Sequence, residues 1–220
     1  MSRNKAKEKV RTAKGRKTGS TRWLKRQLND PYIAKAEQDG YRGRAAYKLL
    51  ELNEKLDFLK EGQTIVDLGA APGGWCQVAT SMGARVVAID LLEVDDMPNM
   101  DFIQMDFMDN DAPDRLKTMI KNHDESGLAD AVISDMAPNT TGHKQTDHLQ
   151  IMAVVEAAYY FAIEVLKPGG IFIAKVRQGG AQNTLLAEMK HDFTTTKHIK
   201  PPSSRKESSE QFLIAQGFKG

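Results

Sequence analysis

The chain has 220 residues, of which 40% are hydrophobic and 27% are charged, and its single cysteine is Cys76. This length predicts one domain with a sizeable core. One cysteine excludes an intramolecular disulfide and a multi-cysteine metal site. No apolar run is long enough for a membrane span or a signal peptide. We therefore expect a cytoplasmic protein without a membrane anchor or a multi-cysteine metal site. The oligomeric state is open, with a monomer favoured.

The charge is distributed unevenly along the chain. Residues 1–30 contain eleven Lys or Arg and two acids, a net of +9, which leaves −7 for the rest of a chain whose total is +2. Residues 1–20 carry almost no apolar side chains, so they cannot bury enough surface to offset the entropy of ordering. We expect 1–20 to be a disordered basic arm that contacts nucleic acid, and 21–220 to be the folded domain. A solvated tail without a partner is the alternative.

The first predicted elements are two helices, at residues 22–39 and 43–58. In the second helix, apolar residues such as Ala46, Leu49 and Leu56 recur at helical spacing. Further along, short β-branched runs alternate with longer helical stretches, which predicts a parallel sheet covered by helices on both faces. The last two strands follow each other without a clear helix, which indicates an antiparallel strand near the end. The predicted strands are 64–68, 85–89, 101–104, 129–134, 170–176, 197–200 and 211–215, and the remaining predicted helices are 73–82, 112–123, 146–166 and 181–192.

A glycine-rich motif, Asp67-Leu-Gly-Ala-Ala-Pro-Gly-Gly-Trp75, directly follows the first predicted strand. Its glycines allow a backbone to approach a ligand closely. Asp90 ends the second strand about twenty residues later, where a carboxylate can accept hydrogen bonds from both hydroxyls of an adenosine ribose. The loop is not Gly-x-Gly-x-x-Gly, and its proline removes an amide that a pyrophosphate would need. An adenosine ligand without phosphates therefore fits best. Asp106, just after the third strand, is placed to meet the adenine amino group or is a solvated turn residue.

Two residues of opposite charge lie at the end of one predicted strand and inside the next. Asp135 follows the fourth strand, and Lys175 lies inside the apolar fifth strand. Burying an ammonium without a partner is costly, so we expect Asp135 and Lys175 to lie close together, as a reactive pair or as a structural ion pair. Lys48 in the second helix and Glu210 before the last strand would, taken singly, be surface charges.

Taken together, these motifs resemble the FtsJ-type heat-shock methyltransferases, which methylate uridine ribose in bacterial large-subunit ribosomal RNA. The resemblance runs from about Thr21 to Gly217 and implies a class I, Rossmann-like fold with a seven-stranded, mostly parallel sheet. It also implies transfer of a methyl group from S-adenosylmethionine to a uridine 2′-hydroxyl of 23S ribosomal RNA, without a metal. The motifs that carry it are Arg22-Trp-Leu-Lys-Arg, Asp30-Pro-Tyr-Ile, Gly40-Tyr-Arg, Arg44-Ala-Ala-Tyr-Lys-Leu, the glycine-rich loop, Asp90-Leu-Leu, Ser134-Asp-Met-Ala-Pro-Asn, Leu166-Lys-Pro-Gly-Gly and Lys200-Pro-x-x-Ser-Arg.

The resemblance also assigns site residues. The family's Lys-Asp-Lys-Glu tetrad falls on Lys48, Asp135, Lys175 and Glu210, and its cofactor contacts fall on Gly73, Trp75, Asp90, Asp106 and Asp135. Two departures stand out: Arg177 occupies a position that is apolar or aromatic in the family, and Glu207 competes with Glu210 as the fourth tetrad member.

Lys175 is the candidate base for the ribose hydroxyl. A lysine must be neutral to accept a proton, which burial and a nearby cation favour and an adjacent carboxylate opposes. Either Lys175 takes the proton, or a charged Lys175 only orients the hydroxyl. Glu210 would position Lys48 or the ribose.

The expected partner is ribosomal RNA of the large subunit. The expected contacts are the basic arm with Arg22, Lys25, Arg26, Arg42 and Arg44. Trp23 and Tyr41 would either stack on bases or pack in the core. Two alternatives remain open: a 2′-O-methyltransferase acting on transfer RNA, and a catalytically silent RNA-binding ribosome-assembly factor.

Overall fold

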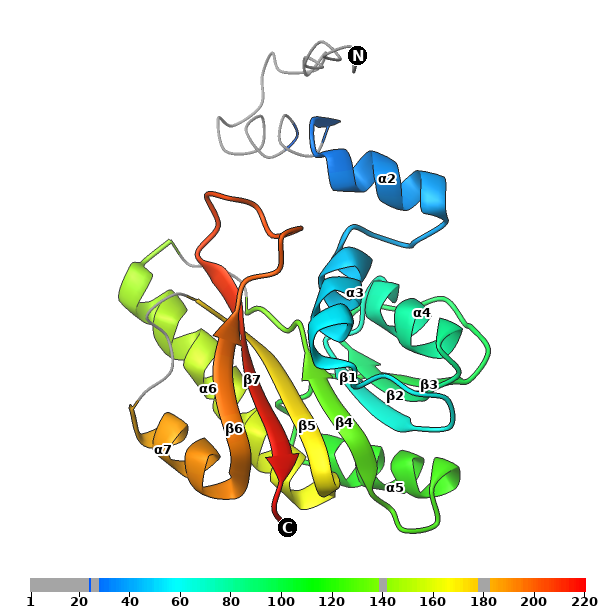
Figure 1. The fold of residues 1–220 in the computed structure, drawn as a ribbon, viewed down its shortest axis with the longest axis vertical. Coiled ribbons are helices and arrows are strands. Elements are labelled where there is room, and N and C mark those ends of the chain that lie inside the picture. Colours follow the sequence, from blue (N-terminus) through cyan, green and yellow to red (C-terminus); the bar gives the residue numbers. More distant parts are fainter. Residues whose placement is uncertain (1–23, 25–27, 139–141, 178–182) are drawn as a thin grey trace.

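The computed structural model describes residue 24 and residues 28–138, 142–177 and 183–220. The basic arm, Arg22, Trp23, Lys25 and Arg26 lie outside these residues. The described part contains a seven-stranded sheet with the order β3-β2-β1-β4-β5-β7-β6 (Figure 1). Its strands are parallel except β7, which runs antiparallel to both of its neighbours. The predicted α/β fold and its late antiparallel strand are confirmed.

The strands lie close to their predicted positions, except that two of them begin earlier than predicted. β5 begins at Leu166 because this residue pairs with Ala129 ahead of an irregularity in the strand, and β6 begins at Phe193, which pairs with Phe218. The strands are β1 Thr64–Leu68, β2 Arg85–Asp90, β3 Met100–Gln104, β4 Ala129–Ser134, β5 Leu166–Arg177, β6 Phe193–Ile199 and β7 Glu210–Phe218. The helices are α2 Pro31–Asp39, α3 Ala45–Leu56, α4 Gly74–Ser81, α5 Ala112–His123, α6 Lys144–Val165 and α7 Asn183–Asp192.

The prediction of one helix over 22–39 is wrong, because α2 begins only at Pro31. Asp30 has an extended backbone, and its carboxylate accepts a hydrogen bond from the amide of Tyr32 at 3.1 Å. Proline is favoured in the first helical turn, where its missing amide hydrogen is no loss, and aspartate is a favoured N-cap. Local capping chemistry at Asp30 therefore starts a new helix.

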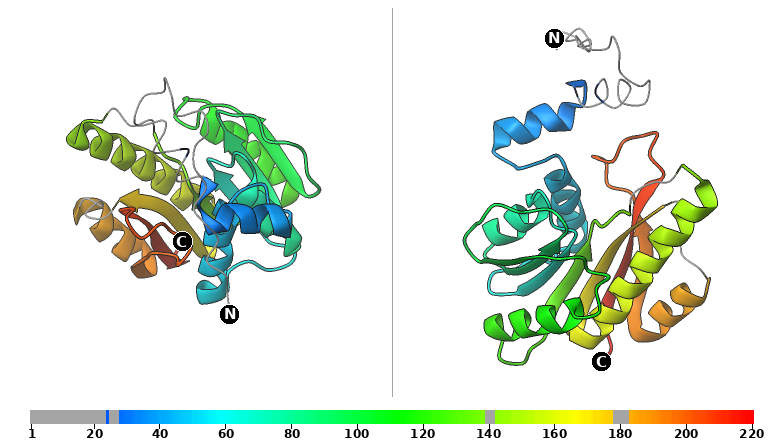
Figure 2. Two further views of the ribbon diagram at one scale, coloured as in Figure 1. Left: turned by 90° about the horizontal axis from the view of Figure 1, so that it is seen from above. Right: turned by 180° about the vertical axis from the view of Figure 1, so that it is seen from behind.

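Helices cover both faces of the sheet, as predicted (Figure 2). Apolar side chains of α3 and α4 form one buried cluster with one set of strand side chains, and those of α5, α6 and α7 form another with the opposite set. Strand side chains alternate between the faces. In β5, Ile171 and Ile173 belong to the α3/α4 cluster, so Lys175 shares their face.

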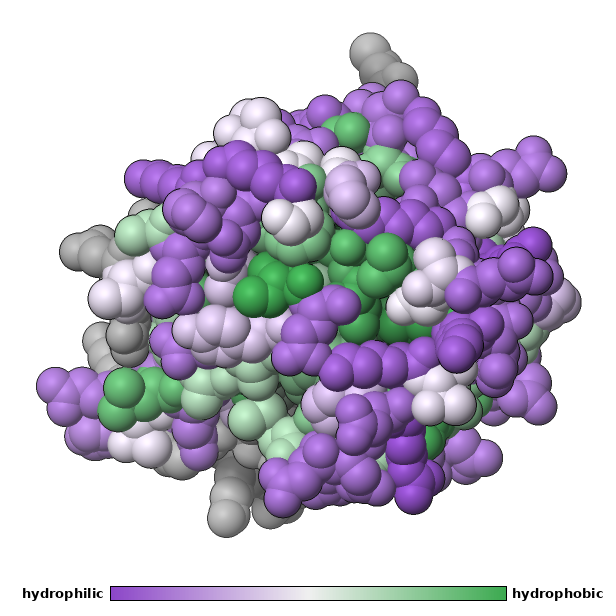
Figure 3. All heavy atoms as spheres, turned by 90° about the horizontal axis from the view of Figure 1, so that it is seen from below, coloured by the Kyte–Doolittle hydropathy of each residue, from purple (hydrophilic) through white to green (hydrophobic). Residues whose placement is uncertain are grey.

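The parallel strands point toward the end of the molecule that carries α2 and the start of α3 (Figure 1). At the opposite end, hydrophilic side chains surround a central hollow in which apolar side chains gather (Figure 3). Among the described residues, no helix combines the length and apolar character that crossing a membrane requires, and no group of three or more His, Cys, Asp or Glu is placed to hold a metal ion.

A small charged cluster joins α5, β4 and β5. The Lys167 ammonium lies 2.6 Å from Asp124 and 3.1 Å from Asp130, and the Asp130 carboxylate accepts the amide of Thr64 at 2.9 Å. The hydrogen bond from Lys167, followed by those from Ser126, lowers the pKa of Asp124 to about 2. The ionised form of Asp124 therefore contributes to stability.

We expect Asp124→Asn to lower the free energy of unfolding by about 1 kcal/mol at pH 7, because water screens this partly exposed pair. The pKa of an aspartate in an unfolded chain is about 3.9, so the stabilisation by ionised Asp124 is present above that pH. It is lost as the pH falls toward about 2, the folded-state value. Urea unfolding at pH 7, 4 and 2.5 checks this. Asp57→Asn, at a carboxylate that is 82% exposed, is the control, and a difference that is independent of pH would contradict the assignment.

Candidate active site

A cavity of about 540 Å³ opens at the carboxyl ends of β1 to β4. The strand order reverses here, because β2 and β3 lie on one side of β1 while β4 and β5 lie on the other. Open parallel sheets bind ligands at such a reversal. The cavity is lined by Gly69, Ala71, Ile89, Asp90, Leu91, Leu92, Met105, Asp106, Phe107, Met108, Asp135, Met136, Ala137, Pro138 and Val154.

Gly69 brings the loop after β1 against the segment after β4. Its φ is +86°, and a Cβ at this position would lie 2.6 Å from the Met136 Cγ and 2.9 Å from the Met136 amide nitrogen. No side chain fits there without moving the Met136 backbone. The motif therefore requires glycine at this position to close one wall of the cavity.

We expect Gly69→Ala to displace Met136 and to weaken binding of an adenosine ligand, on the order of tenfold, by reshaping the wall of the cavity. Gly62→Ala is the matched control, because Gly62 also has a positive φ, +79°, but no atom lies within 4 Å of the added carbon. Both variants carry the backbone strain of a left-handed alanine, about 1 kcal/mol. Titration calorimetry with S-adenosylhomocysteine separates the two, and equal affinities would contradict this role of Gly69.

The two carboxylates predicted to bind adenosine lie in the cavity wall. One Asp90 carboxylate oxygen accepts a hydrogen bond from the amide of Ala71 and the other accepts one from the amide of Leu92, each at 2.8 Å. Asp106 accepts the amide of Met108 at 2.9 Å. These hydrogen bonds fix both side chains before a ligand arrives. Because a carboxylate oxygen can accept more than one hydrogen bond, both side chains can still accept hydrogen bonds from a ligand.

Gly73 and Trp75 are not among the residues that line the cavity. A Cβ on Gly73 would lie 2.7 Å from the Arg42 guanidinium. The Trp75 indole is buried, donates to the carbonyl of Ala45 at 2.9 Å and packs against Phe212 with ring centroids 5.5 Å apart. In this structure Trp75 ties the start of α3 to α4, and the cofactor contacts expected of Gly73 and Trp75 stay predictions.

Two features at or near the cavity were not assigned a role from the sequence. Leu91, Leu92 and Met108 are 62%, 66% and 50% exposed and form an apolar rim beside Asp90 and Asp106. The only sequence signal is a pair of leucines directly after a strand end. Exposed apolar side chains beside a cavity are suited to covering a flat apolar ligand.

The second feature is Asp67, a buried carboxyl at the end of β1. Burial raises its pKa to about 7, although a hydrogen bond from Cys76 opposes the shift. The Cys76 sulfur lies 3.1 Å from one carboxylate oxygen, and the other is buried without a hydrogen-bond partner among the described residues. Asp67 opens the glycine-rich motif, but only the folded structure reveals how deeply it is buried.

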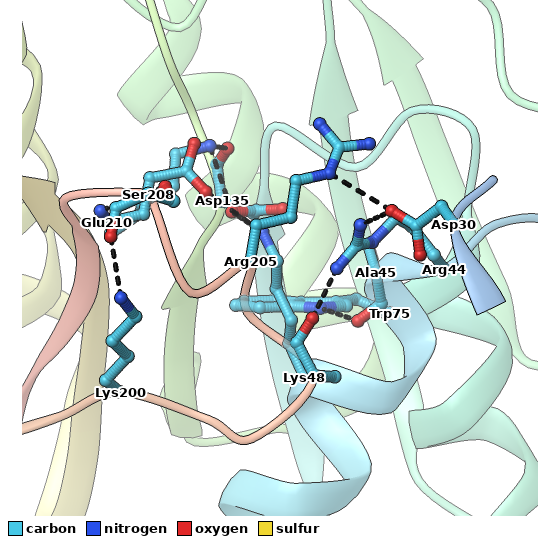
Figure 4. Close-up of polar contacts among 12 residues, drawn as sticks. Asp30, Arg44, Ala45, Lys48, Trp75, Asp135, Lys200, Arg205, Ser208 and Glu210 are labelled. Carbon is cyan, nitrogen blue, oxygen red and sulfur yellow. Dashed lines mark hydrogen bonds and ion pairs between the residues drawn. The ribbon is translucent and has the colours of Figure 1, made fainter. Parts of the chain in front are cut away.

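Two predicted tetrad residues, Lys48 and Lys175, pair with the Asp135 carboxylate. The fourth, Glu210, lies beside Lys48 (Figure 4). Lys175 Nζ lies 2.9 Å from Asp135 Oδ1 and also donates to the Asp135 backbone carbonyl. Lys48 Nζ lies 3.5 Å from the same oxygen and 4.0 Å from Glu210 Oε2. The expected proximity of Asp135 and Lys175 is confirmed. Two ammonium groups, one from α3 and one from β5, thus share one carboxylate oxygen.

Electrostatics keep Asp135 ionised. Burial alone would raise its pKa, but the charges of Lys175 and Lys48 outweigh burial and lower it. The side chains of Lys48, Asp135 and Lys175 are 11%, 18% and 13% exposed, which strengthens their interactions relative to those at the surface. Because Asp135 also lines the cavity, the charged group adjoins the space for a ligand. A cluster of two amines around one carboxylate, placed at this edge, can orient a hydroxyl group and receive its proton.

Of the residues expected to contact RNA, two are already bonded within the domain. Arg42 donates to the carbonyls of Asp95 and Asp96 at 2.7 and 3.0 Å, and Arg44 forms an ion pair with Asp30. Tyr41 packs edge-on against Tyr47, with ring centroids 5.6 Å apart. This contact favours packing in the core over stacking on an RNA base.

A mostly parallel sheet with its cavity at the strand reversal defines a Rossmann-like fold of the class I methyltransferase type. The FtsJ-like methyltransferase family matches residues 41–218, and the chain belongs to this family. A protein of Rhodopseudomonas palustris named ribosomal RNA large subunit methyltransferase E is 55% identical, over 96% of this chain and 90% of its own length. A protein of the same name from Maricaulis maris is 56% identical, over 97% and 75%.

Among solved structures, a Plasmodium falciparum protein described as a ribosomal RNA methyltransferase has a TM-score of 0.70 and 32% identity. The match covers 82% of this chain and all of that one. The chain is therefore a methyltransferase, as the sequence resemblance implied.

Proposed function

We propose that the protein transfers the methyl group of S-adenosylmethionine to the 2′-hydroxyl of a uridine in 23S ribosomal RNA of the large subunit. The observation that carries the proposal is the Asp135 carboxylate shared by Lys175 and Lys48 at the edge of the cavity. The names of the relatives favour ribosomal RNA over transfer RNA. A silent binding protein would have no need for two partly buried lysines on one carboxylate.

The cavity suits S-adenosylmethionine. Its volume, about 540 Å³, lies in the range of about 300 to 1,000 Å³ that is usual for small ligands. Asp90 would accept hydrogen bonds from the ribose hydroxyls, and Asp106 would accept one from the adenine amino group. The apolar rim would cover the base. Bound there, S-adenosylmethionine supplies an electrophilic methyl carbon. Gly73, Trp75 and Asp135 are proposed as further contacts.

In the proposed mechanism, Lys175 accepts the proton of the ribose 2′-hydroxyl as the oxygen attacks. A ribose hydroxyl is a poor nucleophile at neutral pH, so a positioned base accelerates the step. Asp135 holds the Lys175 amine in place. Lys48 stays paired with Asp135 when Lys175 is neutral, so the carboxylate is never buried alone. Glu210 positions Lys48. In the alternative, a charged Lys175 orients the oxygen and the proton leaves late.

The direct test incubates the protein and radiolabelled S-adenosylmethionine with large ribosomal subunits that lack this methylation, with transfer RNA in parallel. We expect label in 23S ribosomal RNA, on a uridine ribose after nuclease digestion, and none in transfer RNA. Label on a base, label only in transfer RNA, or no transfer would each contradict the proposal.

A further inference from the structure

The segment between β6 and β7, residues 200–209, is fixed to α3 at Ser203. The Ser203 amide and hydroxyl both donate to Glu51 Oε2, at 2.8 and 2.7 Å. Its carbonyl accepts a hydrogen bond from Arg44. Ser203 is 1% exposed. One residue of this segment therefore has its amide, hydroxyl and carbonyl all bonded to α3 or to Arg44 at its N-terminal end.

The two groups that hold Ser203 flank Lys48. Arg44, Lys48 and Glu51 are four and three residues apart, a spacing that places them on one face of a helix. Lys48 is also the residue that reaches Asp135 and Glu210. The anchor of the segment and a member of the tetrad therefore share one helix face.

A buried carboxylate reinforces this anchor. Asp30, whose side chain is 5% exposed, pairs with Arg44 and with Arg205 of the segment, the latter at 3.1 Å. In Figure 4 the two arginines approach Asp30 from different parts of the chain. Burial, and then the nearby Glu51 carboxylate, raise the pKa of Tyr32 in α2. Asp30, the N-cap of α2, thus joins this helix to Arg44 and to the segment, while Glu51 joins α3 to the segment.

The segment leads from Ser203 to Glu210 along a bonded path. Lys200 donates to the carbonyls of Lys206 and Ser208 at 3.1 and 2.7 Å, and the Glu210 amide donates to the Ser208 hydroxyl at 3.1 Å. The Glu210 carboxylate itself is 42% exposed and 4.0 Å from Lys48. An ion pair this long and exposed is weak, so it cannot fix Glu210 by itself.

We propose that Glu51 is a positioning residue for methyl transfer, because by holding Ser203 against α3 it keeps Glu210 beside Lys48. This rests on the proposed function. The negative charge of Glu51 separates this role from RNA binding, since an acidic side chain repels phosphates. Its removal should slow the reaction without weakening RNA binding.

The test compares Glu51→Ala, Glu51→Gln and Glu54→Ala under saturating cofactor. Glu54 is an exposed glutamate on the same helix, so its variant makes the same change in charge. We expect Glu51→Ala to lower kcat about tenfold or more, because small displacements of reacting groups are costly, with the KM for RNA unchanged or lower. Glu51→Gln keeps a carbonyl acceptor for Ser203 and should recover most of kcat. Hydrogen exchange at amides 203–210 should quicken only in Glu51→Ala.

Ser203→Ala is the second variant and applies if Glu51→Ala does not fold, because it removes only the hydroxyl donor. We expect a smaller fall in kcat in the same direction. A kcat for Glu51→Ala equal to that of Glu54→Ala, or a raised KM with unchanged kcat, would overturn the positioning role. If the unaltered chain fails to methylate ribose, the proposed function fails instead, and hydrogen exchange still decides whether Glu51 holds the segment.

Discussion

Replacing Lys175 with methionine is expected to lower the single-turnover rate of methyl transfer by about 10²- to 10⁴-fold, the usual contribution of a positioned base. Methionine has a similar length and no charge, so it removes the amine but fills its space. Asp135 keeps Lys48 at 3.5 Å as a partner, so the carboxylate is not left buried and unpaired. We therefore expect the fold and the affinity for S-adenosylhomocysteine to be preserved. Rapid-quench measurements with labelled cofactor give the rate, and titration calorimetry gives the affinity.

The control for Lys175→Met is Lys197→Met, at an exposed lysine in β6, which should transfer methyl groups at the normal rate. A near-normal rate in Lys175→Met with cofactor still bound would exclude both mechanisms proposed for Lys175. The pH dependence of the unaltered protein separates the two. If Lys175 is the base, the single-turnover rate rises about tenfold per pH unit while the amine is mostly protonated. A flat profile would favour the orienting role, and we expect the rise.

Much of the fold could be predicted because its signals are local. Each buried parallel strand is a short apolar run, and the glycine-rich loop directly follows the first strand. The pairing of Asp135 with Lys175 was also predictable, because both lie toward the carboxyl ends of neighbouring strands and a buried ammonium requires a partner. Glu210, rather than Glu207, lies within 4.0 Å of Lys48, and its backbone begins β7 opposite Arg177 of β5.

What could not be predicted depends on contacts between distant parts of the chain. The positions at which β5 and β6 begin follow from pairing with Ala129 and Phe218. Arg44 was expected to face RNA, yet it pairs with Asp30 and with a carbonyl 159 residues away. Glu51 gave no signal, because an isolated glutamate on a helix is usually a solvated charge. Only the fold brings Ser203 to it.

Replacing Asp90 with alanine is expected to weaken binding of S-adenosylhomocysteine about 100-fold. Hydrogen bonds to a charged group contribute roughly 1.5 kcal/mol or more each, and losing the two proposed for the ribose hydroxyls gives about two orders of magnitude in affinity. The amides of Ala71 and Leu92, now bonded to Asp90 at 2.8 Å, would also lose their acceptor, which loosens the wall that meets the ribose.

Titration calorimetry measures this loss of affinity. The affinity of Asp90→Asn should lie between those of the unaltered protein and Asp90→Ala, because its single carbonyl oxygen can replace only one carboxylate oxygen. Asp109→Ala, at an exposed aspartate near the cavity wall, controls for the general effect of removing a negative charge. Unchanged affinity in a folded Asp90→Ala would place the ribose elsewhere. The assignment of this cavity to adenosine would then fail, even if the Lys175 prediction held, because the two predictions depend on different parts of the site.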